Sequence, residues 1–112
     1  MTVNARLVYV TVETYSEAIS IGRSVVTARL AACANVLNHV KSIYWWDGDI
    51  QESDEIVLLL KSRSSLIEAL IEKVRAVHSY DCPCIVVLPI EAGNPQYLEW
   101  IVEETTTAPA LE

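Results

Sequence analysis

Residues 42–50 read Ser-Ile-Tyr-Trp-Trp-Asp-Gly-Asp-Ile, and the Asp47-Gly48 pair within them is the strongest short signal for a β-hairpin. A type I′ turn needs positive φ at both central residues, which Asp followed by Gly tolerates. The flanking residues 34–46 and 50–62 are rich in β-branched and aromatic side chains and show no helical period. Arms of 13 residues at about 3.3 Å each reach about 40 Å, whereas a typical strand has about five or six residues. The sequence therefore predicts a hairpin that is too long for its own domain.

The far end of this hairpin carries Tyr44, Trp45, Trp46 and Ile50. A solitary small domain would expose these side chains as an apolar patch, and such patches mark interaction surfaces. Aromatic residues are enriched at protein interfaces, although the same rings, with Trp100, could instead line a ligand cleft. We expect a neighbouring subunit to cover this end of the hairpin.

The segments before the hairpin predict a strand and a helix. Arg6–Val12 is rich in valine and favours a strand that stops at Glu13. Thr14 to Glu17 then has the Thr-x-x-Glu pattern of a capping box, which predicts a helix start. The helix is expected to run to about residue 32, because apolar and small residues recur at three- and four-residue steps: Ala18, Ile21, Gly22, Val25, Ala28 and Ala32.

The segments after the hairpin repeat this pattern. Ser65 to Glu68 forms a second capping box before an apolar helical stripe made of Leu66, Ile67, Leu70, Ile71, Val74 and Val77. Residues 84–90 read as a buried strand, and Asn94-Pro95 predicts the start of a short helix that ends near Glu104. Residues 105–112 show no periodicity and are expected to form a disordered tail.

The two halves of the chain resemble each other. The Cys-led apolar runs at 33–37 and 84–88 are 51 residues apart, as are the two capping boxes. Two βαβ-like units joined by a hairpin give βαββαβ, so the prediction is an α+β, ferredoxin-like sandwich in residues 1–104, followed by the tail. Its sheet would be antiparallel, with helices on one face and the other face available for assembly.

Composition excludes several classes of protein. The chain has 112 residues, of which 52% are hydrophobic, so one small core is expected and disorder is excluded. A net charge of −7 opposes the phosphate backbone, which argues against nucleic acid as a partner. No apolar run approaches the roughly 20 residues that span a bilayer, so no membrane is expected. Three cysteines suit free thiols in a reducing cytoplasm better than a disulfide framework.

Five motifs resemble the CutA family: LAACANV at 30–36, SIYWWDG at 42–48, the run 55–61, HSYDCP at 78–83, and LPI at 88–90 with GNPQYLEWI at 93–101. The resemblance covers Arg6 to Glu103, and five ordered motifs are far more specific than one short pattern. It implies a ferredoxin-like fold, a tight homotrimer similar in architecture to PII signalling proteins, and an association with tolerance to divalent cations, copper especially. It implies no well-established enzymatic reaction.

Two positions depart from the family pattern. This sequence has Thr11 where some relatives carry Cys, and Cys84 where many carry Glu. One possible soft ligand is therefore lost and another is gained, so a metal geometry does not carry over intact from the family.

A candidate metal site lies in residues 78–84. His78, Asp81, Cys82 and Cys84 combine imidazole, carboxylate and thiolate groups, which suit a weakly bound copper ion or another divalent cation. Against this, Cys-Pro-Cys is not the Cys-x-x-Cys spacing of structural zinc sites, and a strand would hold the two thiols about 7 Å apart. The cysteines could be core residues, and His78 could end the second helix, where a cation is favoured.

The remaining candidates have simpler explanations. Cys33 lies among alanines, which suggests close packing rather than a nucleophile, and His39 is expected on a strand surface. Lys61 and Arg63 could meet an anionic ligand or pair with carboxylates. Five acidic residues near the hairpin tip lack calcium-site spacing and are expected to be a solvated edge: Asp47, Asp49, Glu52, Asp54 and Glu55.

The sequence thus favours a cytoplasmic homotrimer that binds copper or another divalent cation and has no enzymatic activity. The alternative is a PII-like signalling module that binds a small anion or nucleotide between subunits, which rests on fold analogy alone. A cysteine-dependent enzyme is a third hypothesis and would need a thiol activated by a nearby cation.

Overall fold

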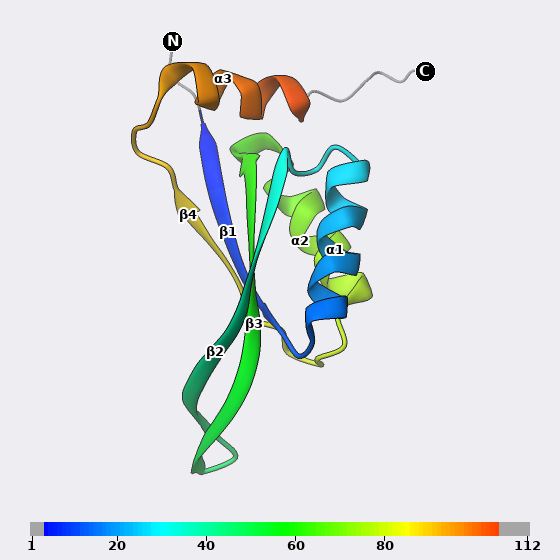
Figure 1. Ribbon diagram of the computed structural model, residues 1–112, viewed down its shortest axis with the longest axis vertical. Coiled ribbons are helices and arrows are strands. Elements are labelled where there is room, and N and C mark those ends of the chain that lie inside the picture. Colours follow the sequence, from blue (N-terminus) through cyan, green and yellow to red (C-terminus); the bar gives the residue numbers. More distant parts are fainter. Residues whose placement is uncertain (1–3, 106–112) are drawn as a thin grey trace.

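A computed structural model describes residues 4–105 as a four-stranded antiparallel sheet with α1 and α2 packed on one face (Figure 1). The strand order is β2-β3-β1-β4, which confirms the predicted α+β, ferredoxin-like sandwich. In chain order the elements are β1 (Ala5–Val12), α1 (Tyr15–Thr27), β2 (Cys33–Trp46), β3 (Asp49–Arg63), the 3₁₀ turn η1 (Ser64–Leu66), α2 (Ile67–Val77), β4 (Ile85–Pro89) and α3 (Pro95–Glu104).

The core lies between the sheet and the two helices on its face. β1 is a central strand, paired with β3 on one side and β4 on the other, and its alternate valines Val8, Val10 and Val12 are fully buried. Side chains from β3, α1 and α2 complete this core: Leu58, Leu60, Ile21, Val25, Leu70 and Val74. The residues buried in β1, α1 and α2 are therefore those predicted by the alternation in β1 and by the apolar stripes of the two helices.

The start of α1 confirms Thr14 as the helix cap, but the Glu17 carboxylate accepts from the Glu13 N–H and not from the Thr14 N–H of a full capping box, and the helix ends earlier than predicted. Thr14 is extended, and its Oγ1 accepts a hydrogen bond from the Glu17 N–H at 3.1 Å. The expectation of a helix to Ala32 is wrong, because Arg29 adopts φ 63° and the Leu30 N–H turns back to the Val25 carbonyl at 2.9 Å. This left-handed turn ends α1 and redirects the backbone toward the start of β2.

The second capping box is also wrong. Residues 64–66 form the η1 turn, α2 begins at Ile67, and no side chain caps it. The Ser64 N–H donates to the Asn4 carbonyl at 2.8 Å, which holds the chain against the start of β1. Ser65 therefore lies inside a 3₁₀ turn, not at the extended position that a capping residue needs.

The long hairpin is confirmed. β2 and β3 remain paired from Cys33–Lys61 to Trp46–Asp49, and one register shift between Leu37 and Val40 marks a bulge where His39 has φ 75°. Asp47 and Gly48 both have positive φ, as the predicted turn requires. The distal half of the hairpin extends away from the body of the domain (Figure 1). Trp45, Trp46 and Ile50 in this half are 72%, 62% and 60% exposed.

The prediction that residues 84–90 form a buried strand is wrong in part. β4 is an edge strand that pairs only with β1, and its outward residues Val86 and Leu88 are about half exposed. Nothing else in the described chain covers this face of β4, so its apolar composition does not mean burial.

At the end of the sheet opposite the hairpin tip lies α3 (Figure 1). The Asn94 side chain accepts a hydrogen bond from the Gln96 N–H and caps the helix, as predicted. Thr105 is fully buried and its hydroxyl donates to the Ile101 carbonyl, so the predicted tail begins one residue too early. The remainder of that tail, 106–112, lies outside the described residues.

Candidate functional site

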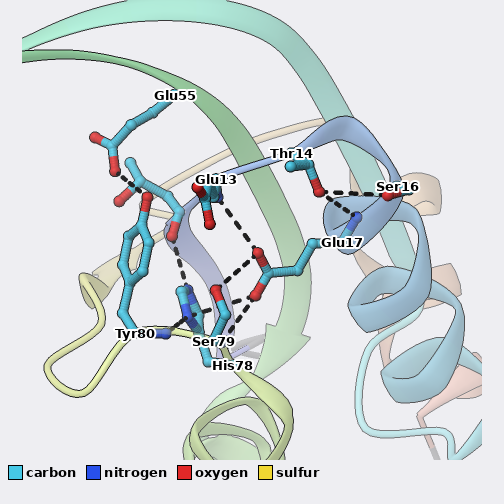
Figure 2. Close-up of polar contacts among 9 residues, drawn as sticks. Glu13, Thr14, Ser16, Glu17, Glu55, His78, Ser79 and Tyr80 are labelled. Atoms are coloured by element: carbon cyan, nitrogen blue, oxygen red, sulfur yellow. Dashed lines mark hydrogen bonds and ion pairs between the residues drawn. The ribbon is translucent and has the colours of Figure 1, made fainter.

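Side chains from α1 and β3, and a backbone carbonyl of β1, contact the loop between α2 and β4, and Figure 2 shows the two carboxylates among them. We call the residues in these contacts the loop cluster, defined as Thr11, Glu17, Glu55, His78, Ser79 and Tyr80. They come from the end of β1, the first turn of α1, the middle of β3 and the loop itself. Because these elements meet only in the folded sheet, the cluster is a product of tertiary structure.

The imidazole of His78 is the buried centre of the loop cluster. Its side chain has no exposed area, its Nε2 lies 2.8 Å from the Thr11 carbonyl oxygen, and its Nδ1 lies 3.0 Å from the Tyr80 backbone nitrogen. A carbonyl only accepts and an amide N–H only donates, so Nε2 carries the proton and Nδ1 accepts. Both ring nitrogens are therefore used to hold the loop backbone.

Glu17 joins the same loop to α1. Its carboxylate accepts hydrogen bonds from the Ser79 N–H at 2.9 Å and from the Ser79 hydroxyl at 3.0 Å. It also accepts from the Glu13 N–H at 3.4 Å and lies 3.7 Å from the Nδ1 of His78. One carboxylate thus supports the helix start, where negative charge is favoured, and the beginning of the loop.

Tyr80 joins the loop to the long hairpin. Its hydroxyl donates to Glu55 of β3 at 3.0 Å, and Ser42 of β2 donates to the other oxygen of the same carboxylate at 2.6 Å. Burial, and then the hydrogen bond to Glu55, raise the pKa of Tyr80 well above its ordinary value. The phenol is therefore a hydrogen-bond donor throughout the neutral range.

The predicted metal-binding residues are divided by this arrangement. His78 points inward, whereas Asp81, Cys82 and Cys84 are exposed, and both cysteines are free thiols. Over residues 4–105, no group of three or more His, Cys, Asp or Glu side chains is placed to hold a metal ion. The four-residue metal site stays a prediction, with its two thiols on the accessible side.

The other candidate residues lie away from the loop cluster. Lys61 donates to the Tyr97 hydroxyl at 3.3 Å and Arg63 donates to the Thr105 carbonyl at 2.9 Å, so both cations contact the α3 region rather than carboxylates. Cys33 donates to the Asn35 side chain and lines an open groove of about 390 Å³ between α1 and β2, with Trp100 at one wall. The groove is lined mainly by small apolar side chains.

The acidic residues near the hairpin tip do not form one group. Asp47, Asp49 and Glu52 are exposed, as predicted for a solvated edge. Asp54 lies 2.9 Å from the Lys41 ammonium group, whose hydrogen bond and charge lower the pKa of that carboxyl group. Glu55 is half-buried in the loop cluster, so the expectation that it belongs to the solvated edge is wrong.

Residues 6–104 match the family model described as CutA1 divalent ion tolerance protein. The chain belongs to the CutA1 family. "Protein CutA 1, chloroplastic" of Oryza sativa is 42% identical over 104 residues, which are 93% of this chain and 59% of that protein. "Divalent-cation tolerance protein CutA" of Pyrococcus horikoshii is 37% identical over 99 residues, 88% of this chain and 96% of that protein.

A solved CutA1 structure supports the fold independently. The crystal structure of CutA1 from Oryza sativa matches with a TM-score of 0.88 at 42% identity, and covers 92% of this chain and 94% of that chain. This CutA1 chain spans a little over half the length of some curated relatives, 59% of the rice protein and 55% of the mouse protein. Within residues 4–105, no helix is long and apolar enough to cross a membrane.

Sequence reasoning missed three members of the loop cluster in this CutA1 chain as partners of His78: Thr11, Glu17 and Tyr80. Thr11 contributes only its backbone carbonyl, which no sequence pattern reveals. Glu17 matches a helix cap in the sequence, and its second role depends on where the loop lies in space. Tyr80 gave a usable signal, because a tyrosine within a polar loop segment often keeps its hydroxyl hydrogen-bonded to a buried acceptor.

Proposed function

We propose that this CutA1 protein is a cytoplasmic homotrimer that contributes to tolerance of divalent metal ions, copper in particular, by binding them weakly and without catalysis. The observation that carries the proposal is the match of residues 6–104 to the divalent ion tolerance family. The Pyrococcus horikoshii relative, which is named a divalent-cation tolerance protein, supports the same role. Free thiols at Cys33, Cys82 and Cys84 suit a reducing compartment.

The proposed metal ligands are in the segment His78–Cys84. Cys82, Cys84 and Asp81 are accessible and combine two soft donors with one hard donor. His78 can join them only if one of its two backbone hydrogen bonds breaks. The free energy lost with that hydrogen bond is consistent with weak metal binding. Of the four proposed ligands, the imidazole therefore adds least to the affinity.

The proposed trimer rests on the exposed end of the hairpin. Tyr44, Trp45, Trp46 and Ile50 are between 41% and 72% exposed in the single chain, which is unusual for such large apolar side chains. β2 is also an edge strand, with one row of backbone groups free to pair. Light scattering is expected to give a mass near three times 12.5 kDa, and a value near 12.5 kDa would contradict the proposal.

The metal-binding role is tested by two measurements. Metal analysis of protein purified without chelators or an affinity tag is expected to find a transition metal, copper above all. Calorimetric titration with Cu²⁺ and Zn²⁺ should then show binding that weakens in the Cys82→Ser and Cys84→Ser variants and changes less in His78→Ala. If neither ion binds the wild-type protein, the proposed function is wrong.

The absence of catalysis in this proposal is tested separately. Among the described residues, no Lys or Arg side chain forms a hydrogen bond with Cys33, Cys82 or Cys84, and the ammonium group of Lys61, the cross-strand neighbour of Cys33, donates to Tyr97 instead. A cation bound to the thiol is the usual means of activating it. We expect iodoacetamide to alkylate all three at neutral pH no faster than free cysteine. One cysteine that reacts many times faster would favour an enzyme.

A further inference from the structure

Two cationic side chains of the described chain have no partner. The sequence holds eight Lys and Arg residues, and six of them donate a hydrogen bond or form an ion pair: Arg6, Arg29, Lys41, Lys61, Arg63 and Arg75. Arg23 of α1 and Lys73 of α2 do neither with any residue in 4–105. Both stay free although acidic residues outnumber basic ones by 15 to 8.

Arg23 and Lys73 line one open groove of about 460 Å³ between α1 and α2, the two helices that lie on one face of the sheet (Figure 1). The rest of its lining comes from α1 and the residue that caps its end: Ser20, Ser24, Thr27 and Ala28. These positions and Arg23 are three or four residues apart along the chain, so they share one side of the helix. Within 4–105, none of the three hydroxyl groups forms a hydrogen bond with another residue. The groove therefore presents two cations and three hydroxyls that the fold does not use.

The stability of the two helices does not account for these cations. A cation is favoured by the helix dipole within the last turn, where α1 has no basic residue and α2 has Arg75. Arg23 and Lys73 each lie four residues before the end of their helix. No Asp or Glu stands three or four residues from either of them, so neither forms the usual ion pair along its own helix.

We propose that the groove between α1 and α2 binds a phosphate group. A guanidinium group such as that of Arg23 donates two parallel hydrogen bonds to phosphate oxygens, and the Lys73 ammonium group supplies a second positive charge. Serine and threonine hydroxyls donate to the remaining oxygens. A carboxylate has only two oxygens, which is too few for the five donor groups that line the groove. This site lies within one chain and is independent of the proposed metal-binding role.

The groove also restricts the molecule that carries the phosphate. Its volume is within the range of about 300–1,000 Å³ that is usual for small-molecule sites, so free phosphate would fill only a small part of it. Among the described residues that line it, Ala28 is the only apolar one, and none has an aromatic ring on which a base could stack. The favoured ligand is therefore a polar phosphate ester, such as glycerol phosphate or a sugar phosphate, rather than a nucleotide.

The test is calorimetric titration of the full-length protein with glycerol phosphate, inorganic phosphate and adenosine monophosphate at low salt, where exposed charges are screened least. We expect glycerol phosphate to bind at one molecule per chain, and adenosine monophosphate to bind no more tightly. Arg23→Gln and Lys73→Gln should each weaken binding about 10-fold or more, because each removes a charge-assisted hydrogen bond to phosphate.

Arg75→Gln is the matched control. It removes the same charge from α2, but Arg75 pairs with Glu72 and does not line the groove. Its affinity for glycerol phosphate should stay within about twofold of wild type, since an exposed ion pair away from the ligand contributes little. Circular dichroism of each variant confirms folding, which substitutions at these exposed positions should not disturb.

The outcomes separate the source of the phosphate from the existence of the site. Tighter binding of glycerol phosphate than of inorganic phosphate identifies an ester as the ligand, and equal binding identifies free phosphate; either result supports the site. Wild-type affinity in Arg23→Gln, an equal loss in Arg75→Gln, or no binding of any phosphate would overturn the inference. Titration of Arg23→Gln with Cu²⁺ should match wild type, so failure here leaves the proposed metal-binding role intact.

Discussion

At the scale of single residues, His78 shows how far the environment changes a side chain's role. In the sequence it stands next to a carboxylate and two thiols and indicates a metal ligand. In the folded chain its two nitrogens contact a carbonyl of β1 and an amide of its own loop. A buried polar group that loses its partner costs about 1–3 kcal/mol, so this imidazole contributes to stability whatever its relation to metals.

Replacing His78 by alanine is expected to lower the free energy of unfolding by about 1–3 kcal/mol, because the Thr11 carbonyl and the Tyr80 N–H both lose a partner. Urea unfolding followed by circular dichroism measures the change. The control is His39→Asn, at an exposed position with positive φ that asparagine also tolerates, and it should stay within about 0.5 kcal/mol of wild type. Equal stability of the two variants would mean that His78 does not anchor the loop.

Tyr80 makes a pH-dependent contribution whose sign follows from its raised pKa. In the unfolded chain a tyrosine loses its proton near pH 10, whereas in the fold burial and Glu55 keep the proton on. The contribution is therefore complete below about pH 10 and is lost as the pH rises from there toward the higher pKa of the folded state. Tyr80→Phe should be about 1–3 kcal/mol less stable than wild type at pH 8, and this difference should shrink above about pH 10.

Absorbance of the phenolate band gives a direct measurement. One of the five tyrosines should titrate later than the rest in native wild-type protein, and that late component should be absent in Tyr80→Phe. Tyr44→Phe is the control, because that exposed hydroxyl contacts only Ser53 at 3.2 Å among described residues. If all five titrate together in the folded protein, the Tyr80–Glu55 bond is not maintained.

At the scale of elements, short sequence patterns predicted the features that depend on neighbouring residues, such as the hairpin turn. They failed for features that depend on contacts between distant parts of the chain, such as the burial of β4. Thr14 and Ser65 begin the same four-residue motif, but only Thr14 is extended before a helix, whereas Ser65 is drawn into a 3₁₀ turn next to a backbone bond to Asn4. β4 has a core-like composition and is half exposed, because burial depends on which elements lie over a strand. The hairpin was predictable because Asp47-Gly48 specifies its own turn.

The candidate site was predictable only in part, for the same physical reason. Residues 78–84 are contiguous, so the sequence indicated that this loop matters. The partners of that loop come from β1, α1 and β3, and their convergence depends on sheet register and on the path of α1. Nothing in the sequence distinguishes Glu55 from the neighbouring acidic residues as the carboxylate that accepts from the half-buried Tyr80 hydroxyl.

At Gly22, α1 packs closely against β2 and β3. A Cβ atom there would lie 3.1 Å from the Ala34 Cβ and 3.4 Å from a Leu58 methyl. Gly22→Val is therefore expected to force α1 off the sheet and to lower the free energy of unfolding by about 1–3 kcal/mol, measured by denaturant unfolding. Gly93→Ala is the control, because its Cβ would make ordinary contacts with Leu98 at 3.4 Å or more. A stable Gly22→Val protein would show that the helix has room to shift.

At the scale of the whole molecule, the described chain is elongated, 46 × 31 × 22 Å, since the hairpin projects beyond the two-layer body. Large apolar side chains cluster toward the projecting end, and the apolar edge of β4 is also uncovered. The buried core of a single chain thus lies in the two-layer body, whereas its exposed apolar surface lies on the projecting hairpin and on β4. The proposed trimer would bury part of that exposed surface.

Trp45 and Ile50 face each other across the hairpin and offer a test of assembly. Replacing both by glutamate should give a protein that keeps its circular dichroism spectrum but elutes and scatters light as a single chain, because two charges would have to be buried in the interface. Gln51→Glu is the control, since it adds one charge at the neighbouring exposed position. A double variant with the mass of the wild-type assembly would exclude this end of the hairpin from the interface.

The free edge of β2 affects how the chain folds as well as the folded structure. Fourteen residues of edge strand, ending in two tryptophans, are a template on which any extended segment can add. If the chain assembles as proposed, a newly folded chain either joins the trimer or aggregates, and the balance between the two depends on protein concentration. Slow dilution during refolding should give dispersed monomers that associate late, and crowded refolding should give precipitate. The yield of dispersed protein would then depend on the rate of assembly relative to the rate of aggregation.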